Sequence, residues 1–79
     1  MALAFVLISI APGDEFRVFK KLKNVLEIDE IYPLFGEYDF LVKLVAEDFE
    51  EIGNIVVNKI RIIRGVTSTK TITEAKFFQ

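Results

Sequence analysis

Four consecutive residues near the middle of the chain, Gly36-Glu37-Tyr38-Asp39, have the chemistry to hold a small zwitterion. A glycine lets the backbone turn tightly and expose its N–H groups, which can receive a carboxylate. The Asp39 carboxylate can accept hydrogen bonds from an ammonium group. The same residues also suit an ordinary hairpin loop stabilised by an aspartate, and taken alone this composition favours the loop.

A second polar feature is a row of hydroxyl groups at Thr67, Thr69, Thr71 and Thr73. Alternate residues of an extended strand lie on one face, so these four side chains are expected to share a surface. Hydroxyls both donate and accept hydrogen bonds, as recognition of a zwitterion requires. Threonine is also a good strand residue whose cross-strand pairs stabilise sheets, and for any single threonine this structural role is favoured.

The composition offers little for catalysis or metal binding. The 79 residues include no histidine and no cysteine, which removes the commonest general base and the thiolate ligands of metals. Glu27, Asp29 and Glu30 are close in sequence, but paired-carboxylate catalysis needs a geometry that sequence does not show. There is no phosphate-cradling glycine loop and no metal-ligand spacing. The sequence predicts no catalytic residue, no metal, no cofactor and no enzymatic activity.

The basic residues Arg17, Lys20, Lys21 and Lys23 form the main positive stretch of a chain whose formal net charge is −2. A domain that grips nucleic-acid phosphates is usually more basic than this. We interpret the stretch as a solvated helix face and expect no direct contact with nucleic acid.

Apolar periodicity and turn residues divide the chain into alternating strands and helices. The predicted strands are Leu3–Ile10, Ile28–Tyr32, Tyr38–Val45 and Val66–Thr73, and the predicted helices are Asp14–Asn24 and Asp48–Arg64. With right-handed crossovers, this β-α-β-β-α-β order gives a ferredoxin-like α+β fold, in which both helices cover one face of a four-stranded antiparallel sheet. We expect a single domain over residues 1–79, with residues 74–79 as a strand extension, a short helix or a docking tail.

The first predicted helix has an N-cap candidate in Asp14 and an apolar stripe formed by Val18, Phe19 and Leu22. Leu26 is a candidate to continue this stripe. The spacing therefore predicts which side of the helix packs against the sheet.

The second predicted helix has clearer boundaries. Asp48 followed by Glu51 resembles a capping box, and Gly65 is a natural stop. The residues at the spacing of one buried helical face are Ile52, Ile55, Val56, Ile60 and Ile63.

The two central strands are apolar on both faces, although two helices can cover only one face of the sheet. In the first strand Leu3, Phe5 and Leu7 lie on one face, and the residues between them are apolar as well. Strands of this kind are normally covered on both sides. We therefore predict a face-to-face homodimer, with further assembly into a ring such as an octamer or decamer. The alternative is a monomer whose tail, with Phe77 and Phe78, folds over the second face.

The apolar run Leu3–Ile10 is too short to span a bilayer, and no lysine or arginine precedes it as in a secretory signal. We expect a cytoplasmic protein with no membrane contact. Few asparagines and glutamines and many isoleucines, glutamates and lysines favour a thermophilic source.

Several motifs occur together in the order and spacing of one known family. They are Pro12-Gly13 after the first strand, the Gly36–Asp39 turn leading into Phe40-Leu41-Val42-Lys43, and Gly65-Val66 followed by Thr69 and Thr71. In these features the chain resembles the effector domain of Lrp/AsnC transcription regulators, also called the RAM domain. The likeness extends to about Glu74.

The resemblance implies the same fold, dimerisation through the sheets, rings of dimers, and amino-acid effectors bound in clefts between dimers. The effector-binding positions that it implies are Leu34, which would line a side-chain pocket, Gly36, Tyr38 and Asp39 in the turn, and Thr69 and Thr71 in the last strand.

Full-length regulators of this family carry an N-terminal helix-turn-helix domain, whereas this sequence begins directly at the first predicted strand. It resembles the stand-alone form, which does not itself read DNA. The expected partners are further copies of the chain, an amino acid, and a full-length Lrp/AsnC regulator whose assembly the protein alters. Two alternatives are a dimeric α+β-barrel enzyme, because fold does not decide function, and a ligand-free oligomerisation module.

Overall fold

The computed structural model describes residues 1–74 and confirms the predicted order of elements. The strands are β1 (Ala2–Ile10), β2 (Ile28–Pro33), β3 (Phe40–Ala46) and β4 (Val66–Thr73), and the helices are α1 (Glu15–Leu22) and α2 (Phe49–Ile55), which continues as the π-helix η1 (Val56–Ile60). All strand pairs are antiparallel, in the order β2-β3-β1-β4. This is the ferredoxin-like α+β fold.

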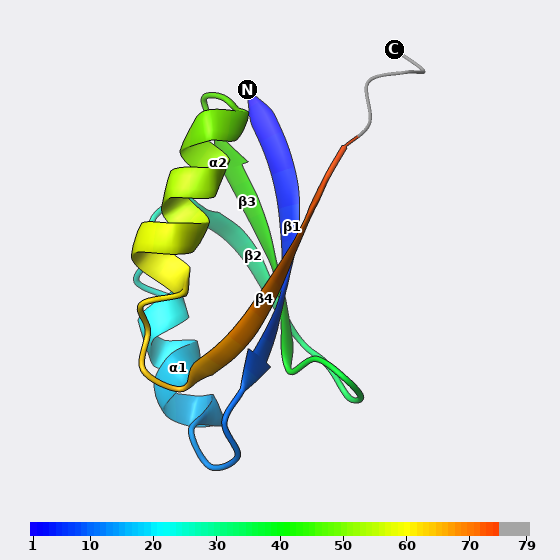
Figure 1. Ribbon diagram of the computed structural model, residues 1–79, viewed down its shortest axis with the longest axis vertical. Helices are drawn as coiled ribbons and strands as arrows, with labels where there is room; N and C mark the ends of the chain where they lie inside the picture. The colour runs from blue at the N-terminus through cyan, green and yellow to red at the C-terminus, as the bar shows by residue number, and fades with distance from the viewer. Residues whose placement is uncertain (75–79) are drawn as a thin grey trace.

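The helices lie together on one side of the sheet, and no helix of residues 1–74 covers the other side (Figure 1). β1 alternates strictly between the two sides: Val6 and Ile8 are fully buried, whereas Phe5 and Leu7 are only partly covered. The largest fully buried side chains are Val6, Ile8, Val18, Leu22, Val42, Leu44, Ile52, Ile55 and Ile60. The core therefore lies between the helices and the two central strands, β1 and β3.

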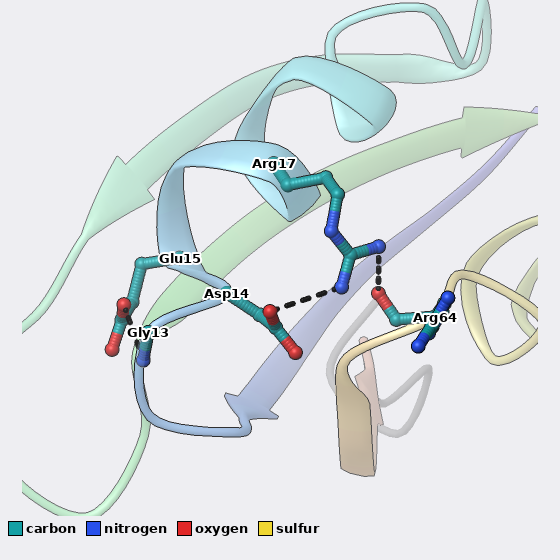
Figure 2. A network of polar contacts seen from close by, with 5 residues as sticks. All are labelled: Gly13, Asp14, Glu15, Arg17 and Arg64. Atoms are coloured by element: carbon teal, nitrogen blue, oxygen red, sulfur yellow. Dashed lines mark hydrogen bonds and ion pairs between the residues drawn. The ribbon is translucent and has the colours of Figure 1, made fainter.

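The start of α1 is tied to the distant connection that leads into β4. Asp14 occupies the N-cap position, but its side chain makes no capping hydrogen bond. Its Oδ1 instead pairs with Nη2 of Arg17 at 3.0 Å, while Nη1 of Arg17 donates to the main-chain oxygen of Arg64 at 2.8 Å (Figure 2). Beside them the Gly13 N–H donates to Oε1 of Glu15 at 3.0 Å.

The prediction that Leu26 continues the apolar stripe of α1 is wrong, because its side chain is 95% exposed. The helix ends at Leu22. Turns follow, in which the Val25 N–H donates to the main-chain oxygen of Leu22 and the Ile28 N–H donates to the main-chain oxygen of Val25. Helical spacing no longer applies beyond Leu22, and Val25 packs against the core instead.

The start of α2 is as predicted. The Asp48 side chain accepts a hydrogen bond from the Glu51 N–H at 2.8 Å, which satisfies one of the free donors at the helix N-terminus. The predicted inward face is also confirmed, with Ile52 and Ile55 buried in α2 and Val56 and Ile60 buried in η1.

The second half of the predicted helix differs from a regular α-helix. In η1 the turns are wider, and the Arg61 N–H donates to the Val56 oxygen, five residues back, at 2.8 Å. Helical structure ends at Ile60 rather than at Arg64, and turns connect it to β4. Ile63 nevertheless packs against the core, because this connection still lies over the sheet.

An ion pair links η1 to the segment before β2. Nζ of Lys59 lies 2.6 Å from Oε2 of Glu27, and the hydrogen bond from this lysine is the main reason that the pKa of Glu27 is lowered. A lowered folded-state pKa adds stability at neutral pH that is lost as the pH falls through that pKa. Both side chains are partly exposed, so the contribution is small.

Gly65 closes the connection before β4 and is constrained in two ways. Its φ is +108°, a conformation that L side chains rarely adopt. A Cβ at this position would also lie 2.9 Å from Cβ of Asp14 and 3.0 Å from Cγ2 of Val18. The Gly65 oxygen accepts from the Ala11 N–H at 2.8 Å, so the backbone has little room to move away.

We expect Gly65→Ala to lower the free energy of unfolding by about 1–3 kcal/mol, because it adds both backbone strain and a clash with α1. Gly53→Ala is the matched control, since Gly53 lies in α2 with nothing within 4 Å of an added Cβ. For Gly53→Ala we expect the free energy of unfolding to rise by about 0.5–1 kcal/mol, because alanine has a higher helix propensity than glycine. Chemical denaturation at one fixed protein concentration measures both, and equal stabilities of the two variants would contradict the argument.

Candidate functional site

The loop between β2 and β3 is fastened to the end of β1 by Asp39. The Asp39 N–H donates to the Ile8 oxygen at 2.8 Å, and Oδ2 of Asp39 accepts from the Ile10 N–H at 2.7 Å. The loop is closed by the Leu34 N–H, which donates to the main-chain oxygen of Asp39 at 2.9 Å. Main chain and side chain of one residue thus hold the loop at the edge of β1.

The conformation of this loop accounts for its glycine. Gly36 has a φ of +121°, and nothing lies within 4 Å of an added Cβ, so the backbone rather than the space requires glycine there. Tyr38 is partly exposed and lies outside the sheet, so the third strand begins at Phe40 and not at Tyr38 as predicted. Leu34 is 37% exposed. The loop projects from the sheet on the side away from the helices (Figure 1).

The Asp39 carboxylate has one occupied oxygen and one available oxygen. Oδ2 stabilises the loop, as the structural interpretation of an aspartate in a turn expects. Within residues 1–74, Oδ1 has no hydrogen-bond partner, and the side chain is only partly buried. This oxygen is therefore able to accept a hydrogen bond from a ligand.

The threonines of β4 lie on the other side of β1. Thr69 is directly opposite Ile8, and Thr71 is directly opposite Val6. Opposed residues of antiparallel strands lie on the same face, so both hydroxyls are on the helix side of the sheet, at its edge. The predicted row is regular from Thr69 onward, whereas Thr67 falls where the register between β1 and β4 shifts.

One chain does not bring the two halves of the predicted site together. β1 lies between the loop and β4, so about 10 Å, or two strand spacings, separates the backbones of Asp39 and Thr69. Thr69 lies on the helix side of the sheet, and the hollow that it lines does not include Asp39. The fold of one chain therefore leaves the two residues on opposite edges of β1.

A hollow at the start of β4 adds a residue that sequence reasoning missed. It has a volume of about 340 Å³ and is lined by Arg61, Val66, Thr67, Ser68 and Thr69. The sequence indicated Arg61 only as a charge suited to a helix C-terminus. No sequence signal indicated the wide turns of η1, after which Arg61 lines the hollow with residues of β4.

An acidic hollow lies near the start of α2, with a volume of about 480 Å³ and carboxylates from Glu27, Glu47, Asp48, Glu50 and Glu51. No group of acidic residues within the described part of the chain has the geometry to hold a metal ion. Among residues 1–74, no helix is both long and apolar enough to cross a membrane.

The face of the sheet opposite the helices is apolar along its centre. Phe5 of β1 lies opposite Ile72 of β4, which is 47% exposed, and Leu7 lies opposite Leu41 of β3. Their other cross-strand neighbours on this face are Lys43 and Lys70. The strand register places these side chains on one surface. The prediction that β1 is apolar on both faces is thereby confirmed.

Polar residues border this apolar stripe on the β2 side. Nζ of Lys43 lies 3.5 Å from Oδ2 of Asp29, and the Tyr32 hydroxyl donates to Oε1 of Glu30 at 2.5 Å. The hydrogen bond to Glu30 is the main cause of the raised pKa of Tyr32. An apolar centre with a polar border is the usual composition of a protein interface.

The element order and the sheet topology define a small ferredoxin-like α+β domain. The profile of the Lrp/AsnC ligand binding domain matches residues 3–75 of this chain. The chain therefore belongs to the Lrp/AsnC ligand-binding-domain family.

The comparisons with individual proteins agree with this assignment. An uncharacterized HTH-type transcriptional regulator of Pyrococcus abyssi is 37% identical over 71 residues, which are 86% of this chain and 47% of that protein. The chain thus spans about half the length of such relatives. The crystal structure of FFRP-DM1 is 32% identical, with a TM-score of 0.89, and the match covers 95% of this chain and 100% of that one.

A more distant likeness is the Neisseria meningitidis transcriptional regulator NMB0573 in complex with L-Met. It is 21% identical, with a TM-score of 0.84, and the match covers 99% of this chain and 52% of that one. At this identity the likeness shows the fold alone.

We expect Asp39→Ala to destabilise the domain by about 1–3 kcal/mol, because the Ile10 N–H, in a residue only 6% exposed, loses its acceptor. Asp39→Asn keeps an acceptor oxygen at the same position, so it should lower the free energy of unfolding by clearly less. Urea denaturation of both variants at one protein concentration makes the comparison. If the two losses were equal, the charge and not the hydrogen bond would hold the loop.

Proposed function

We propose that this domain binds an amino acid between copies of the chain and that binding shifts its assembly, through which it modulates transcription. The observation that supports this most is the separation of the two polar halves by β1. A ligand between two copies would meet the loop of one copy and β4 of another. Neither half encloses a ligand by itself.

In this proposal Oδ1 of Asp39 accepts from the ligand ammonium group. The carboxylate of the ligand has two sets of candidate hydrogen-bond donors. One set is the N–H groups around Gly36 and Tyr38, and the other is the hydroxyls of Thr69 and Thr71. Leu34, partly exposed beside the loop, lines the pocket for the ligand side chain.

The relatives support the class of ligand and the process. The matched family is defined by its ligand-binding domain, and the Pyrococcus abyssi relative is named as a transcriptional regulator. The Neisseria meningitidis regulator of the same fold was crystallised with L-Met, an amino acid. We propose that a full-length regulator of the family is the partner through which this chain affects DNA.

Dimerisation through the open sheet face is the first step of the proposed assembly. Burying Phe5, Leu7, Leu41 and Ile72 removes from water an apolar surface that the helices cannot reach. Dimers then combine into a ring, such as an octamer or decamer, which completes the clefts. A ligand that binds only the completed cleft favours the assembled state by mass action.

A ligand-free oligomerisation module is the second candidate, because Oδ2 of Asp39 already has a structural role. In that case the loop serves assembly alone, and the domain would show the same oligomer with every amino acid. The two candidates therefore differ in one measurable property, the response of the assembly to ligand.

Native mass spectrometry of the purified protein, alone and with each common amino acid, tests the proposed function. We expect an even-numbered oligomer that retains one amino acid or shifts its subunit number in its presence. An oligomer indifferent to all of them would favour the ligand-free module, and a monomer would remove the sheet-to-sheet dimer as well.

Phe5→Lys tests the dimer face separately. We expect it to reduce the dimer to monomers, because a second lysine opposite Lys43 would be buried in the interface next to a like charge. Leu26→Lys is the control, since Leu26 is 95% exposed on the helix side, where it lines a hollow with Ile62. Sedimentation equilibrium reports the mass of each variant, and a dimer of Phe5→Lys would contradict the proposed interface.

A further inference from the structure

We infer that Arg61 holds the carboxylate of the ligand, in the hollow at the start of β4. This rests on the proposed function and assigns the orientation of the ligand, with the carboxylate toward Arg61 and the ammonium toward Asp39 of another copy. Arg61 thereby becomes the residue that selects acids over their neutral analogues.

The lining of the hollow is suited to an anion. Among residues 1–74 it consists of Arg61, three hydroxyl-bearing residues and Val66, and none of these is acidic. The hydroxyls belong to Thr67, Ser68 and Thr69. A guanidinium offers paired N–H donors that match the two oxygens of a carboxylate, and hydroxyls can donate to the remaining lone pairs.

The charge of Arg61 is not neutralised by an ion pair within the described residues. Arg17 is paired with Asp14 and bonded to the main chain of Arg64, whereas Arg61 has no ion pair within residues 1–74. Its guanidinium is therefore available to an external anion without first breaking an internal contact.

The backbone around the hollow is held on both sides. The Arg61 N–H bonds to Val56 in η1, and π-helical turns of this kind occur often at functional sites. On the other side, the Ala11 N–H bonds to Gly65 and the Arg17 side chain bonds to Arg64 (Figure 2). The relative position of Arg61 and β4 is thus defined before a ligand arrives, which reduces the entropy lost on binding.

Exposure of the hollow explains why such a site would depend on assembly. A guanidinium–carboxylate pair in open water contributes little, because both groups remain solvated and screened. A second copy that covers the hollow excludes water and strengthens the same pair. Carboxylate binding at Arg61 and completion of the cleft would therefore favour one another.

The test compares Arg61→Gln with Arg64→Gln, which removes the same charge three residues away, outside the hollow lining. Calorimetry with L-methionine and L-methionine amide measures the preference for the carboxylate. We expect the wild type and Arg64→Gln to prefer the acid, and Arg61→Gln to bind L-methionine roughly 10- to 100-fold more weakly, with that preference lost. If Arg61→Gln retained the full preference, the inference would be wrong while the proposed function stood.

A second measurement does not depend on the identity of the amino acid. Acetate is titrated while the backbone N–H resonances of residues 67–69 are followed by NMR. We expect saturable shifts in the wild type and in Arg64→Gln that are absent in Arg61→Gln. If no amino acid bound but these shifts behaved as expected, the carboxylate site would stand and the amino-acid function would fall. Acetate shifts that were missing from the wild type, or persisted in Arg61→Gln, would overturn the site.

Discussion

β1 is the element against which the rest of the domain is positioned. A strand in the middle of a sheet has two edges and two faces, and three of these are used within the chain: β3 on one edge, β4 on the other, and the helices on one face. Within residues 1–74 no element covers the fourth, the face with Phe5 and Leu7, and the tail considered as its cover, with Phe77 and Phe78, lies outside the described residues. The same strand fixes the core, the register of the threonines and the surface available to a second copy.

The position of β1 also decides what kind of ligand site is possible. On one edge of β1 the Asp39 N–H donates to the oxygen of Ile8. On the other edge Thr69 lies opposite the same residue. The strand itself lies between the two groups of residues proposed to bind the ligand. In the proposed function, ligand binding and assembly are therefore linked, because the second half of the cleft comes from another copy.

Asp39 illustrates how one side chain can have both roles considered for it. Oδ2 accepts from the Ile10 N–H and holds the loop, whereas Oδ1 has no partner within residues 1–74. In the proposed function the carboxylate that shapes the loop also binds the ligand, so the loop conformation depends on whether the ligand is bound. The structural and the ligand-binding interpretations of the Gly36–Asp39 turn are therefore compatible.

The sequence by itself determined the element order, the buried faces and the Asp48 cap, because these depend on local periodicity and on contacts a few residues apart. The tertiary structure decided the exposure of Leu26, the start of β3 at Phe40 and the wide turns of η1, since each depends on where the chain leaves one element to meet another. The sequence indicated the motif residues of the loop and of β4 separately. Only folding placed β1 between them and Arg61 beside β4, because distances across a sheet and positions beyond a helix end follow from packing, which no local pattern encodes.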